Sequence, residues 1–151
     1  LIGSMYANSV KFDKNGNRIL LSTNENKVCI LNCADFTPVH SMIGHDESVV
    51  YAKFNAEETR VISQTLCAQI CLWDSQSGNL ISKHEDNLVE FDVDGNRFLT
   101  VSNNKQARIW DSSTGILIRR LDGVVPWPRA ISFNAYGDRA LIMTWDNTVL
   151  I

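Results

Sequence analysis

Hydrophobic and polar residues alternate along most of the chain in short runs, and turn residues separate these runs. Residues 91–111, FDVDGNRFLTVSNNKQARIWD, show the pattern most clearly. Asp94-Gly95 is a strong signal for a tight turn between two strands. Residues 97–102 and 107–110 alternate as half-buried strands do, and a second turn at 103–105 joins them. Because a helical period is absent throughout, the pattern predicts an all-β fold.

The same stretch recurs along the chain, and each copy begins with a phenylalanine. The four phenylalanines are spaced by 42, 37 and 42 residues and are Phe12, Phe54, Phe91 and Phe133. A Trp-Asp pair follows 19 residues later in two copies, at Trp73-Asp74 and Trp110-Asp111. The first copy has Leu31-Asn32 there, and the fourth copy stops before this position. A period near 40 with short strands and a Trp-Asp ending is typical of a propeller blade.

Each copy predicts up to four short strands. In chain order they are expected from residue 10, then at 18–21, 28–31, 37–43, 49–54, 60–63, 68–73, 80–83, 88–91, 97–102, 107–110, 116–121, 130–133 and 140–143, and from residue 148. The sequence therefore predicts a β-propeller segment of about three and a half four-stranded antiparallel blades, incomplete at both ends. The single domain, 1–151, divides into blade one (about 5–45), blade two (46–84), blade three (85–122) and blade four (123–151).

An arginine follows the phenylalanine by six residues in every copy, at Arg18, Arg60, Arg97 and Arg139. If the turn between the second and third strands is centred 13 residues after the phenylalanine, this arginine faces the residue 20 after it. That residue is Asp74 in blade two, Asp111 in blade three and Asn32 in blade one. We therefore expect cross-strand pairs Arg60–Asp74 and Arg97–Asp111, which set the register at the surface and contribute about 0.2–1 kcal/mol each.

These features resemble the WD-repeat β-propeller family over essentially the whole chain. In that family a Gly-His pair precedes the phenylalanine by nine to ten residues, and Gly44-His45 fits this place in blade two. Family blades hold a hydrogen-bonded tetrad of His, Ser or Thr, Asp and Trp. The resemblance implies that His45, Ser63 and Trp73 are three members of it, with Cys67 in place of the Asp. His45 is then structural and not catalytic.

The other blades match this tetrad less well. In blade three the resemblance assigns Thr100 and Trp110, with Asn104 at the Asp place. The short loop into blade three leaves no room for Gly-His, and His84 lies two positions from the expected place. Each lost tetrad bond forfeits about 1 kcal/mol, so apolar packing between blades must hold the sheets together.

The resemblance also implies a partner-binding edge. In the family, the loops that lead into the blades and the turns between second and third strands share one rim. Trp127 lies in such a loop between two prolines, Trp145 and Asp146 lie in such a turn, and Arg129 is close in sequence. Aromatic and arginine side chains carry much of the energy at protein interfaces. The alternative is that Trp127 packs beneath its neighbour, since tryptophan is mostly buried on average.

Composition limits the classes of partner. The formal net charge is −3, and the 14 basic residues are scattered, which argues against nucleic acid as a partner. No run approaches the roughly 18 to 20 apolar residues of a membrane span, and the first residues lack the features of a signal peptide. We expect a cytoplasmic protein that binds a protein or peptide.

The cysteines raise the question of a zinc site, because they occur as Cys29-x3-Cys33 and Cys67-x3-Cys71. The repeat register places Cys29 and Cys71 in the same strand of neighbouring blades, Cys33 after a strand and Cys67 in a turn. Four ligands at about 2.3 Å from one ion are hard to assemble from such positions. Buried reduced thiols and no metal are therefore expected.

No catalytic motif is present: the chain lacks a G-x-S-x-G elbow, a phosphate-binding glycine loop and His-Glu-x-x-His. Residues 92–95 resemble the start of a calcium loop without its remaining ligands. Glu57-Glu58 is expected to be a solvated turn where the other blades have glycine.

The sequence thus predicts a non-catalytic protein-interaction scaffold without a cofactor, completed by the remaining blades of a larger propeller. One alternative is the sensor array of a multidomain signalling ATPase or other enzyme, which similarity to the WD-repeat tails of large regulatory ATPases suggests. An enzymatic propeller is a third hypothesis, and no matched acid, base or nucleophile set supports it.

Overall fold

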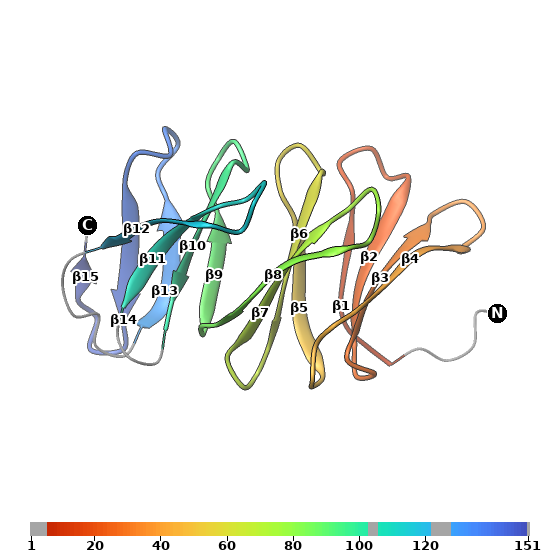
Figure 1. The fold of residues 1–151 in the computed structure, drawn as a ribbon, viewed down its shortest axis with the longest axis horizontal. Coiled ribbons are helices and arrows are strands. Elements are labelled where there is room, and N and C mark those ends of the chain that lie inside the picture. Colours follow the sequence, from red (N-terminus) through yellow and green to blue (C-terminus); the bar gives the residue numbers. More distant parts are fainter. Residues whose placement is uncertain (1–5, 103–105, 122–127, 151) are drawn as a thin grey trace.

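The computed structural model describes residues 6–102, 106–121 and 128–150. All the regular secondary structure in these residues is β-strand. The strands form four antiparallel sheets that stand side by side in chain order (Figure 1). Strands that are neighbours in a sheet are also neighbours in the sequence, so hairpins connect them. The all-β fold and the partial, unclosed propeller predicted from the sequence are confirmed.

The four sheets are called blades one to four. Blade one contains β1 (Ala7–Phe12), β2 (Arg18–Thr23), β3 (Lys27–Asn32) and β4 (Pro38–Ile43). Blade two contains β5 (Val49–Phe54), β6 (Arg60–Thr65), β7 (Gln69–Asp74) and β8 (Leu80–Glu85). Blade three contains β9 (Leu88–Phe91), β10 (Arg97–Val101), β11 (Ala107–Asp111) and β12 (Leu117–Leu121). Blade four contains β13 (Pro128–Phe133), β14 (Ala140–Thr144) and β15 (Val149–Leu150).

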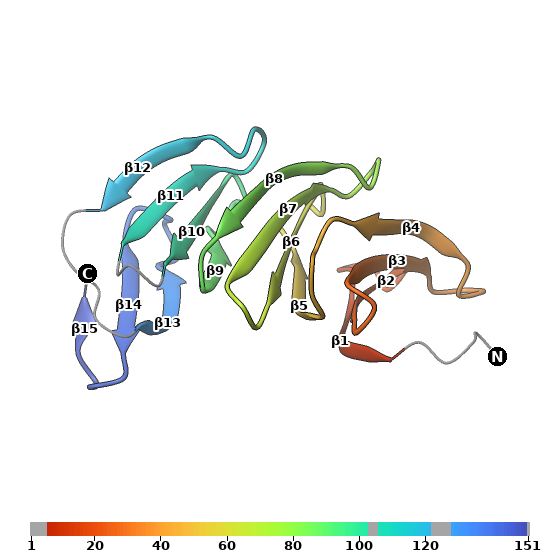
Figure 2. The ribbon, with the colours of Figure 1, turned by 60° about the horizontal axis from the view of Figure 1, so that its bottom comes forward.

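The blades are arranged like a fan. Figure 2 shows the fourth strands, β4, β8 and β12, along one side of the row and the first strands, β1, β5, β9 and β13, along the other. No described segment forms a helix that could cross a membrane.

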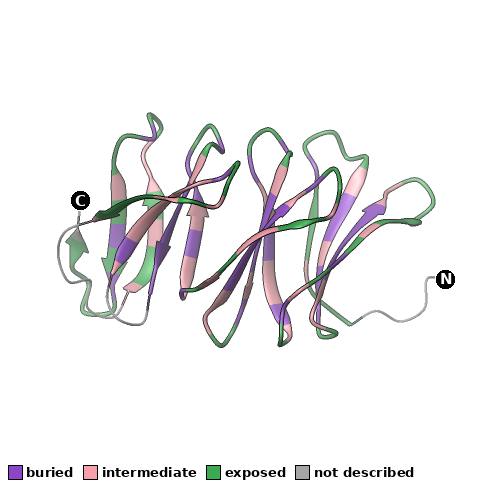
Figure 3. Ribbon diagram, in the orientation of Figure 1, coloured by how far each residue is buried: buried purple, intermediate pink, exposed green. Residues whose placement is uncertain are grey.

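The hydrophobic core lies between the blades, which explains why buried residues run along the middle of every sheet (Figure 3). Between blades one and two, the cluster includes Leu20, Ile30, Val61 and Trp73. Between blades two and three it includes Ile62, Leu72, Phe91 and Phe98, and between blades three and four Leu99, Val101, Ala107 and Ile142. Since apolar burial contributes about 25 cal/mol per Å², these layers hold neighbouring blades together.

Tight turns follow the first strand of each blade. Gly16, Gly95 and Gly137 occupy the same turn position with φ near +70° (+71°, +73° and +67°), a conformation that glycine adopts at little cost. In blade two the position is taken by Glu58, with φ +57°. Glu58 is buried, so the predicted solvated turn is wrong for this residue.

The reason is that the turn of blade two lies against blade one. The Glu58 carboxylate accepts a hydrogen bond from the backbone N–H of Lys14, and its other oxygen lies 3.4 Å from Nη2 of Arg18. The side chain therefore links two blades across the core, although 40 residues separate Arg18 from Glu58 in the sequence.

The predicted register is confirmed, because Arg60 faces Asp74, Arg97 faces Asp111 and Arg18 faces Asn32. The Arg60–Asp74 ion pair forms, with Nη1 2.8 Å from Oδ2. The expected Arg97–Asp111 pair is wrong: Arg97 Nε donates to Asp92 at 2.8 Å instead. Oδ1 of Asp111 accepts hydrogen bonds from the residues of the turn that follows it.

These arginines also connect each blade to the next. The sequence analysis predicted only their pairing within a blade. Arg97 Nη2 donates to the carbonyl of Gly137 in blade four at 2.6 Å. Arg60 Nε donates to the carbonyl of Ser112 in blade three at 2.9 Å. With Arg18, which pairs with Glu58 in blade two, they are called the interblade arginines.

Candidate protein interface

The turns between second and third strands and the connection from blade one to blade two lie along one edge of the row, the lower edge in Figure 1. This edge, formed by residues 24–26, 44–48, 66–68 and 145–147, is called the rim. Binding residues are common in such surface turns, so the exposed side chains of the rim are candidates for contact with a partner.

Trp145 is the largest exposed side chain of the rim, with 66% of its surface accessible. Arg129 of β13 lies over it, with the guanidinium carbon 4.9 Å from the ring centre. The pairing of β13 with β14 is irregular between Pro128 and Ala130, and such a bulge redirects the side chain within it. The structure therefore brings Trp145 and Arg129 together in a cation–π contact.

Asp146 shapes the turn that carries Trp145. Its carboxylate accepts hydrogen bonds from Oγ1 of Thr144 and from the backbone N–H of Thr148 at 3.2 Å. These bonds, that from the Thr144 hydroxyl first, lower the pKa of Asp146. Trp127, the fourth residue predicted for this site, lies outside the described residues.

The rim has a second exposed tip at the turn between β6 and β7, where Leu66 and Cys67 are exposed. The expectation of a buried thiol is therefore wrong for Cys67, because it sits at the end of a hairpin. Cys29 and Cys71 are buried in strands, and burial raises the pKa of the Cys71 thiol to about 12. Among the residues described, no three His, Cys, Asp or Glu side chains gather as metal ligands would.

In blade two, a chain of polar contacts holds Trp73 in the core. Trp73 Nε1 donates to Oγ of Ser63 at 2.7 Å, and Ser63 Oγ lies 2.6 Å from Nε2 of His45. Nδ1 of His45 lies 3.0 Å from the amide oxygen of Gln69. Because an amide oxygen only accepts, Nδ1 carries the proton and Nε2 accepts from the Ser63 hydroxyl.

This arrangement makes His45 structural. Burial lowers its pKa, so the ring stays neutral. Gln69 takes the role that the family resemblance reserved for the residue at the place of Cys67. Gln69 lies two residues after Cys67, at the start of β7. A polar residue at this position faces the loop that carries His45, and this could have identified Gln69 from the sequence.

In blade three, different residues hold the tryptophan in place. Trp110 Nε1 donates to Oγ1 of Thr100 at 2.8 Å, and Thr100 donates to Oδ2 of Asp86 at 2.5 Å. Asp86 is fully buried and pairs with Nη1 of Arg108 at 2.7 Å. His84 instead packs against Trp110, with ring centres 4.1 Å apart and the ring planes tilted by 51°.

Asp86 and Arg108 were not predicted. Asp86 lies in the short loop where no Gly-His fits, and its carboxylate replaces the histidine as the acceptor for Thr100. The sequence feature that could have revealed this pair is Arg108, which faces Thr100 in the register of β10 and β11. An arginine opposite a buried threonine requires an acidic partner nearby.

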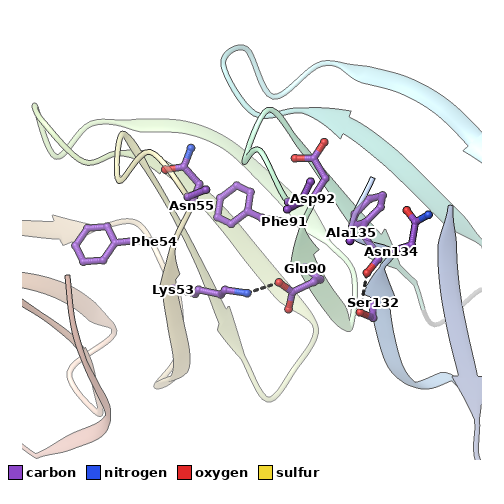
Figure 4. A pocket seen from close by; sticks show the side chains of 12 residues that line it. Lys53, Phe54, Asn55, Glu90, Phe91, Asp92, Ser132, Asn134 and Ala135 are labelled. Atoms are coloured by element: carbon purple, nitrogen blue, oxygen red, sulfur yellow. Dashed lines mark hydrogen bonds and ion pairs between the residues drawn. The ribbon is translucent and has the colours of Figure 1, made fainter. Parts of the chain in front are cut away.

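A cavity of about 370 Å³ opens between the first strands β5, β9 and β13 (Figure 4). The charged residues that line it form ion pairs: Lys53 pairs with Glu90, and Asp92 pairs with Arg97. No buried polar side-chain atom of the described residues lacks a hydrogen-bond partner. The charged side chains that line this cavity are therefore held in ion pairs.

Comparison with known proteins agrees with this geometry. The family model described as "WD domain, G-beta repeat" matches residues 79–111, which include the Thr100–Trp110 pair and the Trp-Asp ending of blade three. Residues 79–111 thus match a WD repeat, and the chain resembles the WD-repeat family. The match covers the end of blade two and most of blade three, and blades one and two repeat the hairpin register of blade three.

Two curated relatives match the chain over a larger span. "COMPASS component SWD3" of Saccharomyces cerevisiae is 27% identical over 128 residues, which are 75% of this chain and 40% of that protein. "U5 small nuclear ribonucleoprotein 40 kDa protein" of Dictyostelium discoideum is 28% identical over 90 residues, 56% of this chain and 25% of that protein. The chain thus spans less than half the length of either relative.

Proposed function

We propose that this WD-repeat chain is a non-catalytic scaffold for protein–protein interaction, and that the rim of blades three and four binds a protein or peptide. The observation that supports this most is Trp145, which is exposed and capped by the Arg129 guanidinium. Tryptophan and arginine dominate the energetics of protein interfaces, and an exposed tryptophan exposes much apolar area.

The relatives support the general role. Their printed names place one in COMPASS and the other in a small nuclear ribonucleoprotein, and a component of an assembly contacts other components. The partner is a protein or peptide, and not nucleic acid or a membrane, because the chain carries a net charge of −3 without a concentrated basic patch.

We also propose that the four blades are part of a larger propeller, whose remaining blades cover the two outer faces. Val10 and Phe12 of β1 are exposed on the first face, and Leu141 and Met143 of β14 on the last. Exposed apolar patches of this kind mark interaction sites, and propellers close with about four to eight blades.

The rim is tested by quantitative capture of partners from a cell extract on the immobilised chain. Trp145→Ala and Arg129→Ala should each reduce the captured proteins by about tenfold, since loss of a hot-spot side chain costs 1–2 kcal/mol or more. Trp127→Ala is expected to act in the same direction. The matched control is Tyr136→Ala, because Tyr136 is an exposed aromatic residue in the turn between β13 and β14, on the opposite edge of blade four.

Far-UV circular dichroism of the Trp145, Arg129 and Tyr136 variants should equal that of the wild type, because these three side chains are exposed. Capture that stays the same in Trp145→Ala and Arg129→Ala, or that falls equally in Tyr136→Ala, would refute the rim as the binding site.

A further inference from the structure

The side of the row on which the first strands lie (Figure 2) has two cavities at the same place of the repeat. One has a volume of about 500 Å³, opens between blades one and two, and is called the first cavity. The other is the cavity of about 370 Å³ in Figure 4, and is called the second cavity. Because each cavity is walled by blades of this chain, the two can be compared position by position.

The residue before the repeat phenylalanine lines each cavity from both sides. In the second cavity, blades two and three contribute Lys53 and Glu90, which form an ion pair (Figure 4). In the first cavity, blades one and two contribute Lys11 and Lys53. The repeat therefore puts two lysines at the place where the next pair of blades has an ion pair, and like charges repel.

A third lysine lines the first cavity two positions after the phenylalanine. It is Lys14, which is exposed, and its Nζ lies 3.5 Å from the carbonyl oxygen of Ala56. The equivalent residues of the other blades are apolar and are Ala56, Val93 and Ala135. Blade one alone therefore adds a positive charge at this position.

Acidic residues do not balance these lysines. Of the residues that line the first cavity, only Glu58 is acidic, and its carboxylate pairs with Arg18 and accepts from the backbone N–H of Lys14. Glu90 pairs with Lys53. Within the described residues, the ammonium groups of Lys11 and Lys14 have no carboxylate partner. The first cavity is thus positively charged, in a chain whose formal net charge is −3.

Tyr51 adds a neutral hydrogen-bond donor to the first cavity. It lies two residues before Lys53 on β5, so the two side chains share one face of the strand. Burial, with a smaller contribution from Glu90, raises the pKa of Tyr51 to about 12, so the phenol keeps its proton at neutral pH. No described residue accepts a hydrogen bond from its hydroxyl. The hydroxyl can therefore donate to a ligand beside the lysines.

We propose that the first cavity binds a small molecule that carries phosphate groups. The ammonium groups of Lys11, Lys14 and Lys53 bind the phosphate oxygens, and the Tyr51 hydroxyl donates to one of them. Phosphate suits this set because it offers several charged acceptor oxygens, and hydrogen bonds between charged groups are the strong ones.

The size and place of the cavity favour a small molecule as the ligand. A volume of about 500 Å³ lies in the usual range of small-molecule sites, roughly 300–1,000 Å³. The lining residues belong to first strands and to the turns that follow them, and these turns lie at the edge opposite to the rim (Figure 1). The site therefore does not depend on the proposed scaffold function.

Isothermal titration calorimetry of the purified chain with pyrophosphate tests the proposal. The wild type should bind pyrophosphate, and added sodium chloride should weaken binding because salt screens the charges. Lys14→Gln should weaken binding by about tenfold, since it removes a charged hydrogen-bond donor. Lys27→Gln is the matched control, because Lys27 is next to the rim and pairs with Glu25. Absence of binding, or equal affinities of Lys14→Gln and Lys27→Gln, would overturn the proposal.

A second variant tests the contribution of Lys53 by gain of function. Glu90→Gln removes the carboxylate that pairs with Lys53 and lowers the negative charge near the site. Pyrophosphate should then bind about threefold more tightly or better, because the freed ammonium group interacts with the ligand alone. An affinity that Glu90→Gln leaves unchanged or lowers would contradict the assignment of Lys53 to the site.

A phosphoserine peptide decides between a small molecule and a protein as the source of the phosphate. The proposal predicts that it binds no more tightly than pyrophosphate. A peptide that binds about tenfold more tightly, and loses this affinity in Lys14→Gln, would replace the small molecule by a phosphorylated protein. Failure of pyrophosphate binding leaves the scaffold function standing, because that function is tested separately by the Trp145 and Arg129 variants.

Discussion

The amide oxygen of Gln69 accepts a hydrogen bond from Nδ1–H of His45 across 3.0 Å. Together with Ser63, this pair connects the loop between blades one and two to Trp73 in the core. Gln69 is itself held, because its amide nitrogen donates to Asp46 at 2.8 Å. Blade two therefore keeps the function of the family tetrad with one member replaced, and the contact positions the loop that contributes to the rim.

The Oγ atom of Ser63 contacts both Trp73 and His45, so removing it should have a clear effect on stability. Ser63→Ala leaves Trp73 Nε1 without an acceptor and His45 Nε2 without a donor, both in the core. The free energy of unfolding should fall by about 1–3 kcal/mol. Urea unfolding followed by tryptophan fluorescence measures this.

The control for Ser63 is Ser132→Ala, because Ser132 is exposed on β13 and its hydroxyl contacts only the adjacent carbonyl at 3.2 Å. Its unfolding midpoint should stay within experimental error of the wild type. Equal midpoints for both serine variants would show that the tetrad-like contacts do not stabilise blade two.

Replacement of Asp86 should lower the free energy of unfolding more than replacement of any residue of the blade-two network. Asp86→Ala leaves Arg108 without its buried partner and Thr100 without its acceptor. Breaking one side of a buried ion pair costs about 3–5 kcal/mol. Asp94→Ala, an exposed aspartate in the turn of the same blade, is the control. A loss below about 1 kcal/mol for Asp86→Ala would mean that the pair is not held as described.

Glu58 allows its interblade contacts to be separated from its backbone conformation. Glu58→Gly loses the contacts to Lys14 and Arg18 but relaxes the left-handed backbone, whereas Glu58→Ala loses the contacts and keeps the strain. We expect Glu58→Ala to be less stable than Glu58→Gly by about 1 kcal/mol. Thermal unfolding by calorimetry compares the two, and an alanine variant as stable as the glycine variant would contradict the assignment.

Acidification should destabilise the chain in two stages. Burial lowers the pKa of His45 and of His84 below 6.5, so the folded chain binds fewer protons than the unfolded chain as the pH falls through that value. The free energy of unfolding is therefore highest above about pH 6.5 and decreases toward pH 5. Hydrogen bonds from the Ser77 and Ser113 turns lower the pKa of Asp74 and Asp111, which adds a further loss below about pH 4.

Urea unfolding at a series of pH values measures both stages. The double variant His45→Gln, His84→Gln should flatten the first stage and leave the second. Stability that rises as the pH falls from about 7 to 5 would contradict buried neutral histidines.

The sequence predicted the strands and their register because both depend on local features. Alternation with period 2 defines the strands, glycine turns such as Asp94-Gly95 end them, and the constant spacing from phenylalanine to tryptophan fixes which residues face each other. Arg60 opposite Asp74 follows directly from that spacing.

What the sequence did not predict depends on contacts between segments far apart. Glu58 is buried because the turn of blade one lies against it, about 40 residues away in the chain. Arg97 had two carboxylates within reach, and its pairing with Asp92 leaves Nη2 directed at Gly137 in blade four. Gln69 and Asp86 replace family residues from different positions, which a motif with fixed spacing does not detect.

Hydrogen exchange of backbone amides tests most directly the central claim that each blade is held by an arginine from the one before it. In Arg97→Ala, the account predicts that protection of β13 and β14 falls by about tenfold or more while β1 to β4 keep theirs, because the Arg97–Gly137 contact joins blades three and four only. Arg119→Ala should change neither. Protection that is unchanged in β13 and β14, or that falls equally in every blade, would contradict the account.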